Sequence, residues 1–230
     1  MIEKKLISQF PAKIIAVDEV GRGPLCGPVV IGAVAITIND RESLNKVLRK
    51  LNSLNITDSK KLKNSERFKI LQVLGFYHMN FKAIKEIELA GFKIKGVVWD
   101  LSAQMIDEEN ILAASLRGMK EAALALSDVK KNDHVLLIDG PHRLRWGEDQ
   151  SPFEEIPIIK GDSKSLLIGL ASILAKVHRD EFMEELHEQI PDFDLHKNYG
   201  YPTKKHREAL QKLGPTEWHR KTFKGVKELL

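Results

Sequence analysis

Short apolar runs that lead directly into acidic residues are the most distinctive pattern along this chain. Residues 14–17 (Ile-Ile-Ala-Val) are followed by Asp18 and Glu19, and residues 135–138 (Val-Leu-Leu-Ile) are followed by Asp139. Runs of this length and composition predict strands that are buried in a sheet. Acidic side chains beside a buried strand are energetically costly unless their charge is compensated. We therefore expect cations near the ends of these strands.

The rest of the pattern alternates between strand-like and helical segments. Residues 28–38 are rich in β-branched side chains and predict a second strand that pairs with the first as a hairpin. Residues 166–189 predict a long helix whose apolar first half is buried. By the same criteria strands are expected at residues 81–89, 94–100 and 156–160, and helices at residues 41–54, from Asn64 or Ser65 to 74, 110–126 and 203–213.

Composition limits the classes to which the protein can belong. Of the 230 residues, 43% are hydrophobic and 30% are charged, which excludes a disordered chain. No apolar run approaches the roughly 18 residues that a membrane span needs, and the chain start lacks the apolar core of a signal peptide. The single cysteine, Cys26, allows neither an intrachain disulfide nor a cysteine-rich zinc site. We expect a cytoplasmic protein in which any metal is bound by oxygen or histidine ligands.

Positive charge is concentrated at the C-terminal end of the chain. The net charge is +4, but residues 196–230 contain nine lysines and arginines against three acids. A basic end on an otherwise nearly neutral chain indicates a surface that binds a polyanion. An ordinary solvated helix face explains the same charges equally well.

The glycine-rich turn at residues 21–27 does not fit a dinucleotide-binding fingerprint. Its spacing is G-x-G-x-x-x-G, and a strand rather than a helix is predicted to follow it. The sequence motifs of P-loop proteins, zinc metallopeptidases and serine hydrolases are absent. His178 and His187 are interpreted as surface residues rather than metal ligands.

Four acids, Asp18, Glu19, Asp139 and Asp162, form the remaining candidate site. Taken singly, each has a structural explanation, as a helix cap, a turn residue before Gly-Pro, or a strand terminus. Together, the strand ends of one sheet can gather them into a set of carboxylates of the kind that binds Mg²⁺ or Mn²⁺. Two such ions about 3.5–4 Å apart activate a water molecule and stabilise the leaving oxygen in phosphodiester cleavage.

Two geometric constraints apply to these acids. Adjacent residues of a regular strand face opposite sides, so Asp18 and Glu19 can share a site only if the strand ends there or if one uses its main-chain oxygen. Asp180 follows Asp162 by about 27 Å along an unbroken helix. We therefore interpret Asp180 either as a structural residue or as one that supports the metal ligands without binding the metal, and in both cases we expect it to pair with a lysine or an arginine.

The motifs of this chain, taken in order, resemble those of the ribonuclease HII family, the bacterial type 2 ribonucleases H. The resemblance covers nearly the whole sequence, and the Gly-Arg-Gly turn favours this family over ribonuclease HIII. It rests on D-E-V-G-R-G-P-L-x-G-P-V-V from Asp18, D-S-K-K-L from Asp58, N-I-L-x-A-S-L from Asn110, L-I-D-G from Leu137, K-G-D-S-K-S from Lys160, A-S-I-L-A-K-V-x-R-D from Ala171 and H-K-N-Y-G-Y from His196.

The resemblance implies an α/β fold, in which a ribonuclease H-like mixed sheet is flanked by helices and followed by a helical C-terminal extension. A catalytic domain is expected over residues 1–190, with a basic extension over residues 191–230 packed on it. The implied activity is endonucleolytic cleavage 5′ to a ribonucleotide, in RNA/DNA hybrids and in ribonucleotide-containing duplex DNA. The expected ends are a 3′-hydroxyl and a 5′-phosphate, and the expected cofactors are two Mg²⁺ or Mn²⁺ ions per active site of a monomer.

The same resemblance assigns roles to residues of this sequence. Asp18, Glu19, Asp139 and Asp162 match the metal-binding carboxylates. Gly21, Arg22 and Gly23 match the turn that reads the ribose 2′-hydroxyl, and Tyr201 matches the tyrosine that packs on the sugar. Lys60, Lys164 and the basic C-terminal helix are expected to hold phosphates, which position a duplex without reading its sequence. The alternative is a catalytically inactive nucleic-acid-binding protein of the same fold, in which the acids are caps and only the basic end functions.

Overall fold

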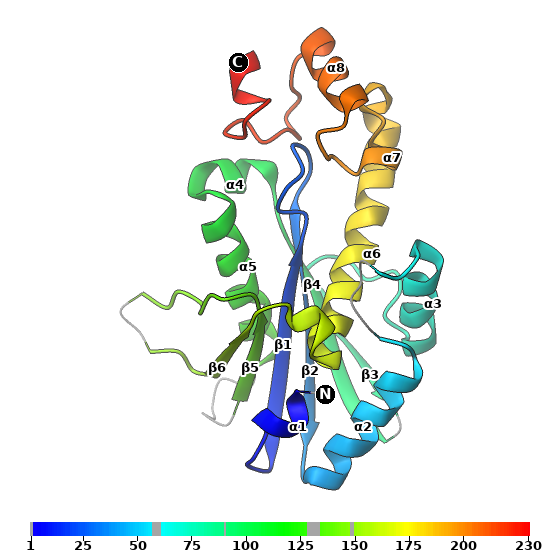
Figure 1. Ribbon diagram of the computed structural model, residues 1–230, viewed down its shortest axis with the longest axis vertical. Coiled ribbons are helices and arrows are strands. Elements are labelled where there is room, and N and C mark those ends of the chain that lie inside the picture. Colours follow the sequence, from blue (N-terminus) through cyan, green and yellow to red (C-terminus); the bar gives the residue numbers. More distant parts are fainter. Residues whose placement is uncertain (1, 57–60, 90, 128–133, 148–149) are drawn as a thin grey trace.

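A mixed six-stranded sheet forms the centre of the computed structural model, which describes residues 2–56, 61–89, 91–127, 134–147 and 150–230 (Figure 1). The strand order is β3-β4-β2-β1-β5-β6. Strands β3, β4, β2 and β1 pair in antiparallel fashion, whereas β5 runs parallel to β1 and β6 runs parallel to β5. The strands are β1 (Ala12–Val20), β2 (Val29–Ile38), β3 (Lys85–Leu89), β4 (Phe92–Leu101), β5 (His134–Asp139) and β6 (Glu154–Ile158).

Helices cover both faces of this sheet, with α2, α3 and α6 on one side and α4 and α5 on the other (Figure 1). The α-helices are α1 (Glu3–Leu6), α2 (Arg41–Ser53), α3 (Asn64–Leu74), α4 (Ala103–Glu109), α5 (Ile111–Leu126), α6 (Leu166–Gln189), α7 (Leu195–Asn198) and α8 (Lys204–Leu213). Short 3₁₀ helices are η2 (Gly161–Ser163), η3 (Pro191–Phe193) and η4 (Lys227–Leu229). None of the described helices is long and apolar enough to cross a membrane.

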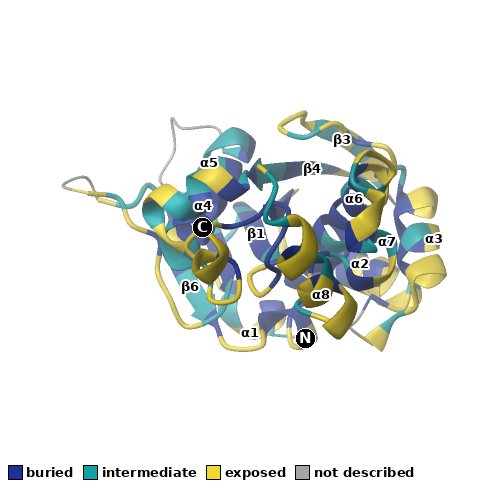
Figure 2. Ribbon diagram, turned by 90° about the horizontal axis from the view of Figure 1, so that it is seen from above, coloured by how far each residue is buried: buried dark blue, intermediate teal, exposed yellow. Residues whose placement is uncertain are grey.

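The first strand is buried on both faces, as its uninterrupted apolar run predicts. Ile14 and Ala16 belong to the hydrophobic cluster that contains α6, whereas Ile15 and Val17 belong to the cluster that contains α5. This division follows from the alternation of side chains along a strand. Figure 2 shows the buried strands enclosed by helices whose outer faces are exposed. Asp18 and Glu19, which follow Val17, therefore lie at the boundary of the hydrophobic clusters on the two faces of the sheet.

A third hydrophobic cluster joins the C-terminal segment to the β1–β2 turn. Leu25 and Cys26 of the turn are buried with Met183 of α6, Phe193 of η3 and Leu210 of α8. In Figure 1 the C-terminal segment lies at the end of the molecule that the β1–β2 turn reaches. Residues that follow α6 thus enclose the glycine-rich turn.

Several local predictions differ from the structure. Strand β1 does not end at Asp18 but continues to Val20, and β3 begins at Lys85 rather than at residue 81. The cap of α6 is Ser165, whose side chain accepts a hydrogen bond from the Ile168 N–H, while Asp162 lies in η2.

The interpretation of His178 as a surface residue is wrong. Its side chain is buried, with Nε2 accepting from the Met79 N–H at 3.1 Å and Nδ1 lying 2.8 Å from the Leu174 carbonyl oxygen. Burial lowers the pKa of His178, which favours the neutral ring that these two contacts require.

Candidate active site

Asp18 and Asp139 lie side by side because β1 and β5 run parallel. The register pairs Val17 with Ile138, so the next residue of each strand is one of these two acids. Alternation places both side chains on the face that carries Ala16 and Leu137, which belong to the cluster around α6. The parallel register therefore brings together two acids that are distant in the sequence.

Asp162 reaches the same face through the turn that follows β6. The Gly161 N–H donates to Asp139 Oδ1 at 2.6 Å, and the Asp162 N–H donates to the same oxygen at 3.4 Å. Lys160 adopts a left-handed conformation, with φ of 56°, that starts this turn. The η2 backbone therefore holds the Asp139 carboxylate. Asp162, whose N–H takes part in this contact, is itself buried beside Asp139.

Helix α6 closes over Asp18 because the sheet has a glycine opposite that acid. Gly32 on β2 pairs with Asp18, and a Cβ atom at Gly32 would lie 2.0 Å from the Ala171 main-chain oxygen. Only glycine allows so close an approach. The approach brings Ser172 of α6 to Asp18, whose carboxylate accepts a hydrogen bond from it. Sequence motifs included Ser172 in the family match but assigned it no role.

Glu19 lies on the other side of β1, because the strand continues past it and alternation still applies. Its main-chain N–H donates to Asp18 Oδ1 at 2.7 Å, and its side chain pairs with Arg22 at 3.2 Å. The structure thus places Asp18, Asp139 and Asp162 on one face and Glu19 on the other side of β1, close enough for its charge to interact with those of Asp18 and Asp139. In the part of the chain that the structure describes, no three histidine, cysteine or acidic side chains are already positioned to hold a metal ion.

The electrostatics of these acids reflect burial and crowding. Burial raises the pKa of Asp18 well above its usual range, and the neighbouring charges of Asp139, Glu19 and Asp162 raise it further. Burial also raises the pKa of Glu19 to about 7, with Asp139 adding to the rise and Arg22 opposing it. Carboxylates in this environment repel one another, and a bound cation would favour their charged forms.

The glycine-rich turn beside these acids is held against the C-terminal segment. Gly21 has a φ of 94°, and a Cβ atom there would lie 2.1 Å from Arg179 Nε. The Leu25 N–H donates to the Gly200 carbonyl at 2.8 Å. Tyr201 lies against Gly23, at 3.5 Å from the position of a Cβ atom there, and its side chain is 45% exposed. The structure therefore brings Gly21, Gly23 and Tyr201 together.

Tyr201 is held through its main chain by a pair of buried histidines. His206 Nδ1 lies 2.9 Å from the Tyr201 carbonyl oxygen, and His206 Nε2 lies 3.1 Å from His219 Nε2. His219 Nδ1 accepts a hydrogen bond from the Thr216 N–H at 3.0 Å. Burial lowers the pKa of His219 to about 4 and also lowers the pKa of His206, which favours neutral rings. With both rings neutral, one continuous chain of donors ends at Tyr201.

Two buried arginines that sequence analysis did not single out surround the turn. Arg179 of α6 and Arg220 of the C-terminal segment are fully buried. Their guanidinium groups donate to main-chain carbonyls of residues 21–28 and of Tyr199. The only sequence signal was the position of Arg179 in the motif that begins at Ala171, directly after the apolar half of a helix, where an unpaired charge is costly if buried.

The predicted phosphate-binding lysines have different outcomes. Lys60 lies outside the described residues. Lys164 follows Asp162 by two positions, is exposed, and donates from Nζ to the Ile159 carbonyl at 2.7 Å. Lys164 is therefore close to the candidate acids in the chain, but its side chain is folded back on the turn that precedes it. In the basic C-terminal helix α8, four exposed cations are Lys204, Lys205, Arg207 and Lys212.

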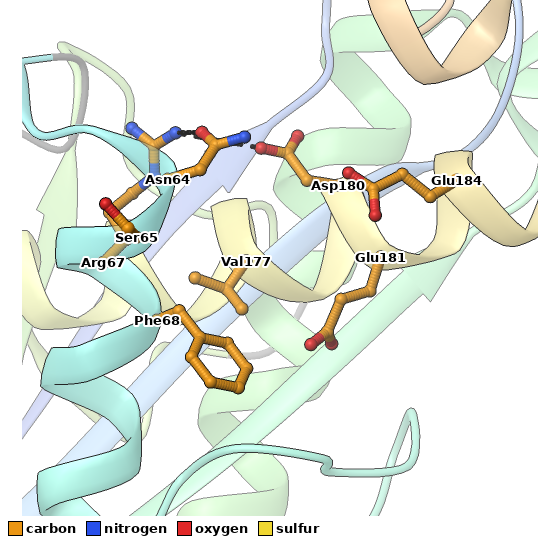
Figure 3. Close-up of a pocket in the computed structure, with 8 residues that line it drawn as sticks. All are labelled: Asn64, Ser65, Arg67, Phe68, Val177, Asp180, Glu181 and Glu184. Atoms are coloured by element: carbon orange, nitrogen blue, oxygen red, sulfur yellow. Dashed lines mark hydrogen bonds and ion pairs between the residues drawn. The ribbon is translucent and has the colours of Figure 1, made fainter.

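Asp180 lines a cavity of about 310 Å³ between α3 and α6, whose lining includes none of the four candidate carboxylates (Figure 3). Its carboxylate accepts a hydrogen bond from Lys176 Nζ at 2.5 Å and lies 3.8 Å from Arg67. Figure 3 shows Arg67 and Asn64 of α3 directed toward Asp180. The predicted pairing of Asp180 with a lysine or an arginine is confirmed, because both kinds of partner are present.

Comparisons with known proteins point to one family over nearly the whole chain. The family model described as Ribonuclease HII matches residues 15–226. The ribonuclease HII of Desulfotalea psychrophila is 40% identical over 218 residues, covering 94% of this chain and 82% of its own length. That of Caldanaerobacter subterraneus is 39% identical over 221 residues, covering 96% and 78%.

Solved structures show the same architecture. The ribonuclease H2 from Pyrococcus horikoshii has a TM-score of 0.65 at 22% identity, covering 94% of this chain and 96% of that one. Bst-RNase HIII, solved in complex with Mn²⁺, has a TM-score of 0.65 at 16% identity, covering 95% of this chain and 69% of its own.

The fold is therefore the α/β fold of the ribonuclease H class, as the resemblance of the motifs implied. Within that class, the chain belongs to the ribonuclease HII family. Family and fold together identify a nuclease of the ribonuclease H type, which acts on nucleic acid.

Proposed function

We propose that this protein hydrolyses the phosphodiester bond 5′ to a ribonucleotide, both in RNA/DNA hybrids and in duplex DNA with embedded ribonucleotides. The products are a 3′-hydroxyl and a 5′-phosphate. The observation that carries this proposal is the adjacency of two features on β1 and the turn after it. Asp18 lies among the other candidate carboxylates, and the Gly21–Gly23 turn begins three residues later.

The carboxylates fit two Mg²⁺ or Mn²⁺ ions by their chemistry. All of the donors are oxygens, and the repulsion among Asp18, Asp139 and Asp162 is what a divalent ion relieves. Because no described group of three is already closed around an ion position, rotation of side chains would complete the site. One structural neighbour, Bst-RNase HIII, was solved in complex with Mn²⁺, which is consistent with this assignment.

In this proposal the ions, when bound, supply an activated water molecule and stabilise the leaving oxygen. Asp18 and Asp139 are the central ligands, since they lie on adjacent strand ends. Asp162 would complete their face, and Glu19 would contribute from the other side of β1. The η2 backbone amides orient Asp139, and Ser172 orients Asp18, so that hydrogen bonds hold the two carboxylates on the adjacent strand ends.

The turn and Tyr201 provide selection for a ribonucleotide. Glycine at positions 21 and 23 lets the backbone approach a sugar closely, and the 2′-hydroxyl is the group that distinguishes RNA from DNA at one position. Tyr201 offers an exposed ring beside Gly23 on which that sugar can pack. Lys60, Lys164 and the cations of α8 bind phosphates without reading sequence.

Residues 1–190 form the catalytic domain in this proposal, and residues 191–230 form an extension that packs on it. The shared cluster of Leu25, Met183 and Leu210 supports that arrangement. We further propose that the protein is a monomer and that it works in the cytoplasm. A reducing compartment fits its one cysteine, Cys26, which is buried and unpaired.

The test is an incision assay on a labelled DNA duplex with a single ribonucleotide. The purified protein is incubated with Mg²⁺, with Mn²⁺ or with EDTA. We expect one cut on the 5′ side of the ribonucleotide with either metal and none with EDTA. An all-DNA duplex of the same sequence is the control, and it should remain uncut.

The alternative is the catalytically inactive binding protein. It is favoured by the lack of a closed three-ligand group among the described residues. It predicts that the duplex binds and remains intact with either metal. That result would reject the proposed hydrolysis and leave only the basic C-terminal end with a function.

A further inference from the structure

One buried side chain, Arg220, contacts both ends of the Gly21–Gly27 turn. Its Nη2 donates to the carbonyls of Gly21 at 2.6 Å and of Gly27 at 2.9 Å, and its Nη1 donates to the Arg22 carbonyl at 3.0 Å. Its Nε also donates to Gly27, at 3.1 Å. The planar guanidinium thus holds both ends of the turn in a fork geometry that an ammonium group cannot reproduce.

These contacts determine where the neighbouring N–H groups point. In a trans peptide the carbonyl and the following N–H lie on opposite sides of the peptide plane. Because the carbonyls of Gly21 and Arg22 point inward to Arg220, the N–H groups of Arg22 and Gly23 point away from it. Both residues are exposed, and no hydrogen bond among the described residues uses either N–H. Two consecutive amides are therefore presented outward, beside Tyr201.

Arg179 fixes the other side of the same arrangement. Its Nε donates to the Pro28 carbonyl at 3.1 Å and its Nη2 to the Cys26 carbonyl at 3.4 Å. Both carbonyls lie at the C-terminal end of the turn. Its Nη1 donates to the Tyr199 carbonyl at 3.1 Å, two residues before Tyr201. Arg179 therefore connects the turn to the segment that carries the exposed tyrosine.

The charge of this pair is unusual for a purely structural brace. Both side chains are fully buried, and in the described part of the chain neither forms an ion pair with a carboxylate. Main-chain carbonyls satisfy their donors, but they do not cancel two net positive charges, which remain costly to bury. Burial and, next in size, the nearby charge of Arg179 together lower the pKa of Arg220 to about 9, yet the group stays protonated at neutral pH. A polyanion at the turn would compensate both charges.

We infer that Arg220 and Arg179 are positioning residues for ribonucleotide selection. Arg220 orients the Arg22 and Gly23 amides toward an oxygen of the ribonucleotide, and Arg179 keeps that turn in register with Tyr201. The inference rests on the proposed function, because it explains how that function distinguishes a ribonucleotide from a deoxyribonucleotide.

The first experiment compares the wild type with Arg220→Lys, which keeps the charge and removes the fork. Affinity is measured in EDTA for two duplexes that differ only by one ribonucleotide or deoxyribonucleotide. We expect the preference for the ribonucleotide duplex to fall about tenfold in the variant, since charge-assisted contacts that orient the amides are lost. Affinity for the all-DNA duplex should change less than about twofold.

The matched control is Arg49→Lys. Arg49 is an exposed arginine on α2 that donates to one main-chain carbonyl, and its replacement should leave the preference unchanged. If Arg220→Lys weakens binding of both duplexes equally, or lowers only thermal stability, the brace is merely structural and the inference is overturned. If the wild type itself neither prefers nor cuts the ribonucleotide duplex, the proposed function fails and the inference fails with it.

A second measurement does not depend on the folding of a variant. In ¹H–¹⁵N spectra of the wild type, the Arg22 and Gly23 amides should shift more with the ribonucleotide duplex than with the all-DNA duplex. Arg179→Lys should reduce that difference while Arg49→Lys preserves it. Equal shifts with both duplexes would overturn the inference even if Arg220→Lys proves insoluble.

Discussion

The candidate site has two halves, which bury charges of opposite sign. The carboxylate half consists of the four candidate acids, and the turn half consists of the Gly21–Gly27 turn with Arg179 and Arg220. In the carboxylate half, Asp18 lies buried among three other acids, and its charge is unfavourable. In the turn half, Arg179 and Arg220 are also buried, but their donors are all directed to main-chain carbonyls. The first half is electrostatically incomplete without a cation, whereas the second has its hydrogen bonds already formed.

This difference indicates a division of labour. Groups that already have their partners are rigid, so the turn can present a fixed geometry to a sugar before anything binds. Groups that repel one another are stabilised when a ligand brings the opposite charge, so the carboxylates gain most from binding. Changes in the carboxylate half should therefore alter metal dependence and rate, and changes in the turn half should alter selectivity.

The largest expected effect comes from Asp139→Asn. It removes one of the two central carboxylates but keeps the oxygen that accepts from the Gly161 N–H. Cleavage of the single-ribonucleotide duplex should fall at least about a thousandfold, because metal-assisted activation of water is lost. Duplex binding should persist, as measured by fluorescence anisotropy. Substantial residual cleavage would remove Asp139 from the set of ligands.

The next effect concerns stability, and Glu19→Gln tests it. A carboxyl group whose pKa is raised from 4.5 to about 7 costs the folded state stability at pH 8, where it is charged, and much less below pH 5. Without divalent metal, the variant should gain up to about 3 kcal/mol in the free energy of unfolding at pH 8, and about 1 kcal/mol or less at pH 5.

Urea unfolding at the two pH values measures this difference. Repeating the measurement with Mg²⁺ tests whether the ion removes the unfavourable charge. Mg²⁺ should stabilise the wild type more than Glu19→Gln, because the ion relieves repulsion that the variant no longer has. An equal gain at both pH values would mean that packing, not charge, makes Glu19 unfavourable.

In the turn half, Tyr201→Ala should lower the rate at a single ribonucleotide about tenfold, given the usual strength of aromatic packing on nucleic acid. The side chain is 45% exposed, so the free energy of unfolding should stay within about 0.5 kcal/mol of the wild type. Tyr77→Ala, at another exposed tyrosine, is the control. An unchanged rate would remove Tyr201 from the site.

The smallest effect is expected from Lys164→Ala. This exposed lysine lies next to the carboxylate half, and its role in the proposal is to hold a phosphate. Binding of ribonucleotide and all-DNA duplexes should weaken by the same small factor, and the slope of log affinity against log salt should fall by about one. A selective loss for the ribonucleotide duplex would instead connect Lys164 with selection. Lys50→Ala, on the exposed face of α2, is the control.

Much of the secondary structure, and the family, could be predicted from the sequence. Helix α6 begins and ends at the predicted residues 166 and 189, and the hairpin of β1 and β2 is confirmed. These features follow from hydrophobic periodicity, which depends on residues that are close in the sequence. The motif resemblance identified the family that the comparisons then showed.

Only the tertiary structure decided which charges meet. The parallel register of β1 and β5 aligns Asp18 with Asp139, whereas the continuation of β1 to Val20 puts Glu19 on the opposite side of the strand. No local pattern specifies either result, because strand pairing and strand length depend on packing across the whole sheet. The burial of Arg179 and Arg220 around the Gly21–Gly27 turn has the same origin: the sequence shows two ordinary arginines, and the C-terminal segment encloses them.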